Sequence, residues 1–139
     1  MTRGKIFFVS DELIYSSIEF NGDMMPDSLG EFAIDCLQKA NDWKSFVEQL
    51  KWFDNKFFHY NENVNGGIYR SRPLSDNSFN FAEDYFKNFG SDYLYIKNNG
   101  SKTLKIIDAN DTYHFVQPQE IVCYQFGKVC DIEQYLKGN

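Results

Sequence analysis

Apolar and polar positions alternate over short runs in the C-terminal part of the chain, and four such runs predict β-strands. Each run is rich in aromatic and β-branched residues, and they lie at 93–96, 104–107, 113–116 and 121–126. Asn98-Asn99-Gly100-Ser101 separates the first two runs, and Asn-Gly is a strong hairpin signal because both residues tolerate a positive φ. All the connections are short, so the strands are expected to pair in chain order as a four-strand antiparallel meander.

Two more strands are predicted near the N-terminus, at residues 5–9 and 13–20. The first is an unbroken apolar run after Lys5, which is typical of a strand that is buried on both faces. The second alternates and ends at the turn-forming residues Asn21-Gly22-Asp23. We expect a hairpin that either extends the C-terminal sheet or packs across it.

The central part of the chain has the spacing of amphipathic helices. Ser28 and Glu31 stand at capping-box spacing before the first helix, and Asp42 is the expected N-cap of the second. The expected core-facing residues of these two helices are Leu29, Phe32, Ala33, Cys36, Leu37 and Ala40, followed by Trp43, Phe46, Val47, Leu50, Phe53 and Phe57. A third helix is predicted to begin at Ser78 or Asn80 and to end at Gly90, and a last helical turn is expected at 131–137.

This order of elements predicts the α+β class in one domain that spans residues 1–139. The expected architecture is an antiparallel sheet with a C-terminal four-strand meander and an N-terminal hairpin, on which about three helices pack. Aromatic residues make up 18% of the chain, so it has enough apolar surface to build a core.

The sequence also indicates in which cellular compartment the protein is expected. No apolar run approaches the roughly 18 residues needed to cross a bilayer, and the N-terminal apolar run is too short for a secretory signal. The cysteines Cys36, Cys123 and Cys130 are odd in number and lack CxxC spacing, which argues against a disulfide framework and a zinc site. We therefore expect a cytoplasmic protein with reduced thiols.

Negative charge is concentrated near the N-terminus. The segment from Ile6 to Gln38 holds seven acids and no Lys or Arg, so it carries −7 of a net charge of −6 and the rest of the chain carries +1. Such a field repels nucleic acid and anionic membranes, and it attracts a basic protein or a cation. The alternative is an ordinary solvated acidic face.

Motifs for catalysis or cofactor binding are absent from the sequence. It contains no phosphate-binding fingerprint, calcium loop or nucleophile signature, so no cofactor, metal or catalytic residue is predicted. A Cys123–His114 pair with Asp108 or Asp111 is conceivable, because the proposed strands are adjacent. Free Cys is more often a buried small apolar residue.

In size, acidity, aromatic content and expected location, the chain resembles bacterial toxin-immunity proteins, which neutralise secreted nuclease toxins. No family motif carries this resemblance, so no site residue is taken from it. The resemblance implies a non-catalytic protein that captures and neutralises a basic partner through an acidic, aromatic-rich surface. From the residues themselves, the expected partner-binding acids are Asp23, Asp27, Glu31 and Asp35, which follow the first hairpin and line one helix.

The alternative prediction is a small enzyme or small-ligand-binding protein. Its site would lie between the meander and the 59–72 loop, where Tyr69, Arg70, Arg72 and His114 would orient an anionic ligand. The two predictions differ in shape, because an enzyme needs a concave site with converging polar side chains.

Overall fold

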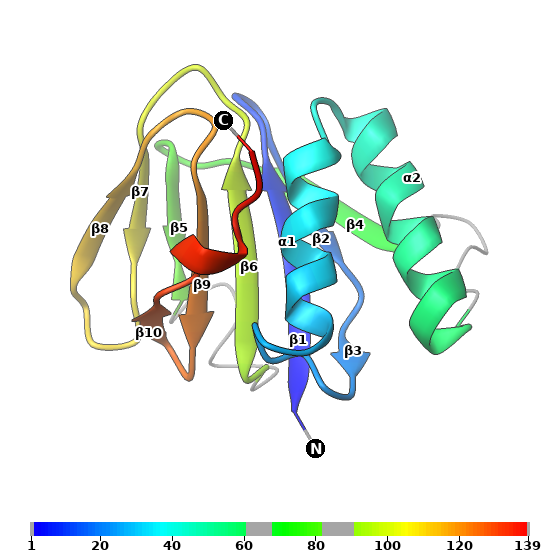
Figure 1. The fold of residues 1–139 in the computed structure, drawn as a ribbon. Helices are drawn as coiled ribbons and strands as arrows, with labels where there is room; N and C mark the ends of the chain where they lie inside the picture. The colour runs from blue at the N-terminus through cyan, green and yellow to red at the C-terminus, as the bar shows by residue number, and fades with distance from the viewer. Residues whose placement is uncertain (1, 61–67, 82–90, 139) are drawn as a thin grey trace.

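The computed structural model describes residues 2–60, 68–81 and 91–138, and these form three stacked layers (Figure 1). Two α-helices form the first layer, a large mixed sheet forms the second and a small mixed sheet forms the third, all counted within the described residues. No helix in this part of the chain is long and apolar enough to span a membrane. The class is α+β, as the sequence predicts.

The large sheet has seven strands within the described residues. They are β1 (Arg3–Val9), β2 (Leu13–Ser17), β3 (Phe20–Asn21), β4 (Tyr69–Pro73), β6 (Tyr93–Asn98), β9 (Ile121–Gln125) and β10 (Lys128–Cys130). Their order is β10-β9-β6-β1-β2-β4, and β3 pairs with the start of β1. β1 is antiparallel to β2 and parallel to β6, so the sheet is mixed.

The small sheet contains β5 (Ser78–Asn80), β7 (Leu104–Ile107) and β8 (Tyr113–Val116). β7 lies in the middle, parallel to β5 and antiparallel to β8. This sheet covers the face of the large sheet that the helices leave open (Figure 1).

The helical layer consists of α1 (Leu29–Lys39) and α2 (Trp43–Phe53), and α2 continues into the π-helix η1 (Asp54–Phe58). Asp42 caps α2 as predicted, because its carboxylate accepts a hydrogen bond from the Ser45 amide at 2.8 Å. A short 3-10 helix, η2 (Glu133–Tyr135), follows β10.

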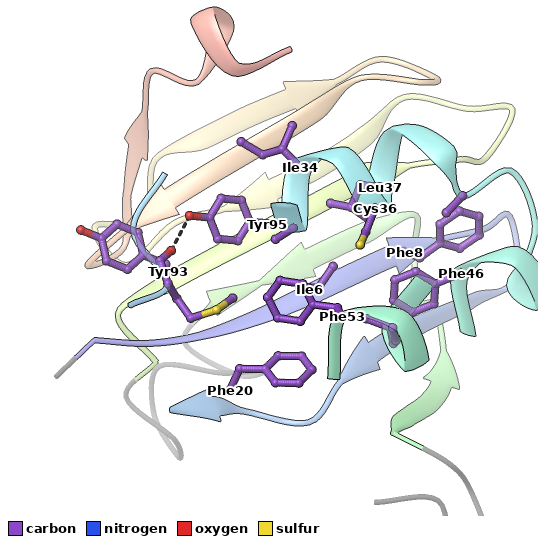
Figure 2. Close-up of a cluster of buried hydrophobic side chains, with 14 of the residues drawn as sticks. Ile6, Phe8, Phe20, Ile34, Cys36, Leu37, Phe46, Phe53, Tyr93 and Tyr95 are labelled. Carbon is purple, nitrogen blue, oxygen red and sulfur yellow. Dashed lines mark hydrogen bonds between the residues drawn. The ribbon is translucent and has the colours of Figure 1, made fainter. Parts of the chain in front are cut away.

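Two apolar cores lie on opposite faces of the large sheet. The helix-side core, part of which Figure 2 shows, includes Ile6, Phe8, Phe20, Ile34, Leu37, Phe46, Phe53, Tyr95 and Cys123. The inter-sheet core joins Phe7, Val9, Leu94, Ile96 and Tyr124 to Phe79, Leu104, Ile106 and Val116 of the small sheet. Successive residues of β1 therefore belong to different cores, which is why the strand is an unbroken apolar run.

All four strands of the predicted meander form, but only the pairing of β7 with β8 is confirmed; β6 does not pair with β7, nor β8 with β9. β6 pairs with β9, while β7 and β8 pair with each other in the small sheet. The side-chain amide of Asn98 donates to the carbonyls of Lys102 and Val116, both at 2.9 Å, where the chain leaves one sheet for the other. β6 needs cover on both faces, and β7 supplies it on the inter-sheet side. The N-terminal hairpin is confirmed as β1–β2 and belongs to the large sheet.

The helix predictions also need correction. The described residues contain two α-helices. The predicted start of a third helix at Ser78 or Asn80 is wrong, because Ser78–Asn80 forms β5, and the rest of that prediction, residues 82–90, lies outside the described residues. Ser28 makes no side-chain capping bond, because the Gly30 and Glu31 amides, which a cap would bond, donate instead to the carbonyls of Met25 and Ser28. Two of the expected core-facing residues, Phe32 and Trp43, are exposed instead.

Candidate functional site

A groove of about 260 Å³ lies between the turn before α1 and the C-terminal segment that follows β10. We call it the acidic groove; its lining residues are Met25, Pro26, Asp27, Tyr93, Gln125, Cys130, Asp131, Gln134 and Tyr135. Asp27 and Asp131 are both exposed. Asp27 belongs to the turn before α1 and Asp131 to the C-terminal segment, and we call these two lining segments the Asp27 bank and the Asp131 bank. None of the described residues that line the groove is Lys, Arg or His. Its electrostatic character is therefore that of a cation site.

Buried contacts hold the Asp27 bank in place. The Met24 side chain is fully buried. The Met24 backbone amide donates to the Thr2 hydroxyl at 3.0 Å, and the Met24 backbone carbonyl accepts from the Tyr95 hydroxyl at 2.5 Å (Figure 2). The Met25 carbonyl then accepts from the amides of Ser28 and Gly30, both at 2.9 Å. These bonds fix the turn that presents Asp27 beside the start of α1.

The Asp131 bank is fixed at both ends of the C-terminal segment. The Asp131 carboxylate accepts a hydrogen bond from the Glu133 amide at 3.1 Å, just before η2. The next residue, Ile132, is buried in the helix-side core. Further along, Gln38 of α1 donates to the Lys137 carbonyl at 3.0 Å and accepts from the Lys137 amide at 3.2 Å. The groove is thus a fixed feature of the fold, since both banks are tied to α1 and to the core.

Two phenol rings complete the groove. Tyr93 of β6 lies almost fully buried, and Tyr135 of η2 is half-buried. Burial raises the pKa of Tyr93, and the nearby Cys130, Cys123 and Asp27 raise it further, so the phenol stays neutral. A neutral ring with carboxylates beside it suits an organic cation, because cation–π attraction adds to the ionic attraction.

The other predicted acids do not line this groove. Glu31 and Asp35 are half-buried and one turn apart, and Asp35 forms an ion pair with Lys39 at 2.9 Å. Asp35 is therefore locally neutralised, whereas Glu31 forms no ion pair with the described residues. Asp23 is exposed in the turn after β3, where its positive φ of 47° is one that Asp tolerates.

An exposed aromatic patch lies where the two helices and η1 meet. We define the aromatic patch as Phe32 of α1, Trp52 of α2 and Phe57 of η1, whose ring centroids lie 4.9–6.3 Å apart. Phe32 and Trp52 are 39% and 42% exposed, which is high for large apolar side chains that contact each other. Phe32 and Asp35 are three residues apart on α1, so these two side chains are neighbours on the helix surface.

The structure does not bring the alternative ligand residues together. Tyr69, Arg70 and Arg72 lie on β4 at one edge of the large sheet. His114 lies on β8 and packs on Tyr124 of β9, and three strands separate β9 from β4. Part of the predicted 59–72 loop, residues 61–67, lies outside the described residues.

His114 instead pairs with Asp108, at 2.8 Å from Nε2 to the carboxylate. Burial would raise the pKa of Asp108, but hydrogen bonds from His114 and from the amides of Thr112 and Asn110 outweigh burial and lower it. Cys123 is not part of this pair, because it faces the helix-side core while Tyr124, which His114 contacts, faces the inter-sheet core. Within the described residues, no three His, Cys, Asp or Glu side chains group closely enough to hold a metal ion.

Sequence reasoning named Asp27 but missed Asp131, Tyr93 and Tyr135. These residues come from three segments that are far apart in the chain, so no local spacing connects them. The single available clue was the acid pair Asp131 and Glu133 after the last strand.

Comparisons of the chain with protein-family models, with curated proteins and with solved structures found no match, so the groove is interpreted from its own geometry.

Proposed function

We propose that this chain is a non-catalytic binding module of the immunity type, which captures and neutralises a basic protein such as a nuclease toxin. In this proposal one Lys or Arg side chain of the partner enters the acidic groove between Asp27 and Asp131. The single observation that carries the proposal is the lining of the groove, which pairs two carboxylates with two phenols and, among the described residues, includes no basic side chain.

The acidic groove encloses about 260 Å³, which is room for one long side chain from a partner surface. Carboxylate oxygens would accept hydrogen bonds from a guanidinium or ammonium group, and the Tyr135 ring would cover its apolar stem.

The surroundings of the groove supply the rest of an interface. Glu31 adds negative charge on α1, and the aromatic patch of Phe32, Trp52 and Phe57 offers exposed apolar area on the same helical layer. Protein interfaces commonly combine aromatic anchors with complementary charge, where charge steers the encounter and buried contacts slow dissociation. The −7 segment at residues 6–38 provides the steering field.

The first test measures binding of an arginine-rich peptide by isothermal titration calorimetry, with a citrulline-substituted peptide as the neutral control. We expect the wild-type chain to bind the arginine peptide and the double variant Asp27→Asn with Asp131→Asn to bind it at least roughly 30-fold more weakly. This estimate follows because losing one partner of a buried interfacial charge pair costs about 2–5 kcal/mol.

The matched control is Asp76→Asn with Asp111→Asn, which changes net charge equally at two exposed positions outside the groove. Both positions have positive φ, 51° and 61°, which Asn adopts readily. Equal weakening by the two double variants would mean that the peptide responds to net charge alone, and the groove assignment would then be wrong.

The second test identifies the partner. The immobilised chain is exposed to lysate of its native host at low and high salt, and retained proteins are identified by mass spectrometry. We expect one basic protein in one-to-one ratio, lost with the groove variant and kept with the matched control. Retention of no basic protein at either salt would refute the capture function, whatever the peptide result.

A further inference from the structure

Two of the three cysteines face each other across the last hairpin. Cys123 of β9 and Cys130 of β10 are register partners, and they are joined by a tight turn at Phe126-Gly127, whose φ values of 50° and 82° are both positive. The sequence shows only a spacing of seven residues, so this juxtaposition is a product of the hairpin register.

The geometry suits a disulfide bond. Directly opposed residues in an antiparallel pair have Cα atoms about 4.5 or 5.5 Å apart, and disulfides need Cα separations of about 4.4–6.8 Å. Both side chains lie on the helix-side face, where Cys123 is fully buried and Cys130 packs against the same core.

We propose that Cys123 and Cys130 form a reversible intramolecular disulfide when the protein meets a hydroperoxide. Cys130 reacts first, because its side chain is partly exposed whereas that of Cys123 is fully buried. Its thiolate attacks one peroxide oxygen, so an S–O bond forms, the O–O bond breaks and, with hydrogen peroxide, water leaves after protonation. Cys123 then attacks the Cys130 sulfur, so the S–S bond forms, the S–O bond breaks and a second water leaves. The two thiols lose two electrons and two protons, and the peroxide is reduced.

The two cysteines have different roles because their surroundings differ. Burial raises the pKa of the Cys123 thiol, as does its contact with Cys130, so Cys123 stays protonated and protected until Cys130 is oxidised. Cys36 provides an internal control within the same chain. It is fully buried against the Gln49 carbonyl on α2, and burial raises its pKa to about 12.

The disulfide would join the edge strand β10 to β9 next to the Asp131 bank of the groove. Closing this short ring restricts the unfolded chain, so the oxidised protein should unfold at a higher temperature than the reduced protein. This inference does not depend on the proposed function, because it rests only on the register and burial of the two thiols.

The test treats the folded wild-type chain, at low concentration, with hydrogen peroxide. Remaining thiols are then alkylated under denaturing conditions, and the protein is mapped by trypsin and mass spectrometry. Lys128 lies between the two cysteines, and no Lys or Arg lies between Ile6 and Gln38, so each cysteine falls in its own tryptic peptide.

We expect linked peptides that contain Cys123 and Cys130, an alkylated Cys36, and full reversal by dithiothreitol. Sulfinic acid at Cys130 with Cys123 still a thiol would overturn the proposal, as would links to Cys36 or links between molecules only. Cys36→Ala should oxidise like wild type, and Cys123→Ser should leave a sulfenic acid at Cys130 that dimedone labels. Because the wild-type peptide map is decisive alone, the test does not depend on either variant folding.

Discussion

Gly30 is a position where the structure predicts that even a methyl side chain would destabilise the fold. It lies in the first turn of α1 and is buried against β6. A Cβ atom at this position would lie 1.9 Å from the Tyr95 hydroxyl and 2.6 Å from the Met25 carbonyl oxygen. The same hydroxyl donates to the Met24 carbonyl (Figure 2). Gly30→Ala should therefore disturb both the packing of α1 on β6 and a buried hydrogen bond.

Two effects of opposite sign compete in Gly30→Ala. Helix propensity alone would stabilise the Ala variant by about 1 kcal/mol. Overpacking costs about 1–3 kcal/mol, and a buried hydroxyl that loses its acceptor costs about 1–3 kcal/mol more. The expected net effect is a destabilisation of about 1–5 kcal/mol, so the sign of the change separates the two effects.

Urea unfolding, followed by circular dichroism, measures this change. With a slope of about 1–3 kcal/mol per molar urea, a loss of 3 kcal/mol lowers the midpoint by about 1–3 M. A cycle with Tyr95→Phe tests the cause, because that change removes the atom nearest to the added methyl group. Rescue should be partial, since the Met25 oxygen and the Tyr95 ring carbon remain within 2.7 Å of the Cβ position. A higher midpoint for Gly30→Ala would refute the packing argument.

Two further predictions concern buried polar groups in the inter-sheet core and at its edge. The Tyr124 hydroxyl is buried without a hydrogen-bond partner among the described residues, so Tyr124→Phe should leave the urea midpoint unchanged or raise it. Tyr95→Phe should lower the midpoint, because the Tyr95 hydroxyl donates to the Met24 carbonyl. A clearly lower midpoint for Tyr124→Phe would contradict this prediction. The pKa of Asp108 is lowered in the folded protein, so its carboxylate stabilises the fold above its ordinary pKa, and this stabilisation is lost as the pH falls through the folded-state pKa. Asp108→Asn should therefore lower the urea midpoint at neutral pH and weaken the dependence of stability on pH in acid. An unchanged acid dependence in Asp108→Asn would show that the His114 pair does not contribute as described.

Local elements were predictable where a few neighbouring residues decide them. The strands at β6–β9, the β1–β2 hairpin and the Asp42 cap all follow from periodicity or from a single side chain that bonds its own backbone. The cap at Ser28 was predicted by the same reasoning and is wrong, because the first amides of α1 donate to backbone carbonyls and not to the Ser28 hydroxyl. The turn before α1 is held by Tyr95, which lies far away in sequence.

The candidate site was only partly visible in the sequence. The excess of acids at residues 6–38 pointed to Asp27, and the structure places this residue on the groove. Asp131 and Tyr135 sit among residues with no distinctive spacing, and they reach the groove only because β10 returns beside β9. The same hairpin brings Cys123 and Cys130 together.

By itself, the sequence determined the α+β class, the positions of most strands and both helices, and the double-sided burial of β1. It did so because periodicity and turn chemistry act over a few residues. Only the tertiary structure decided that β6 would pair in parallel with β1 and that β7 and β8 would leave for a second sheet. Strand pairing depends on which apolar faces can be buried together, and β1 and β6 each had two faces to cover, one by the helices and one by the small sheet.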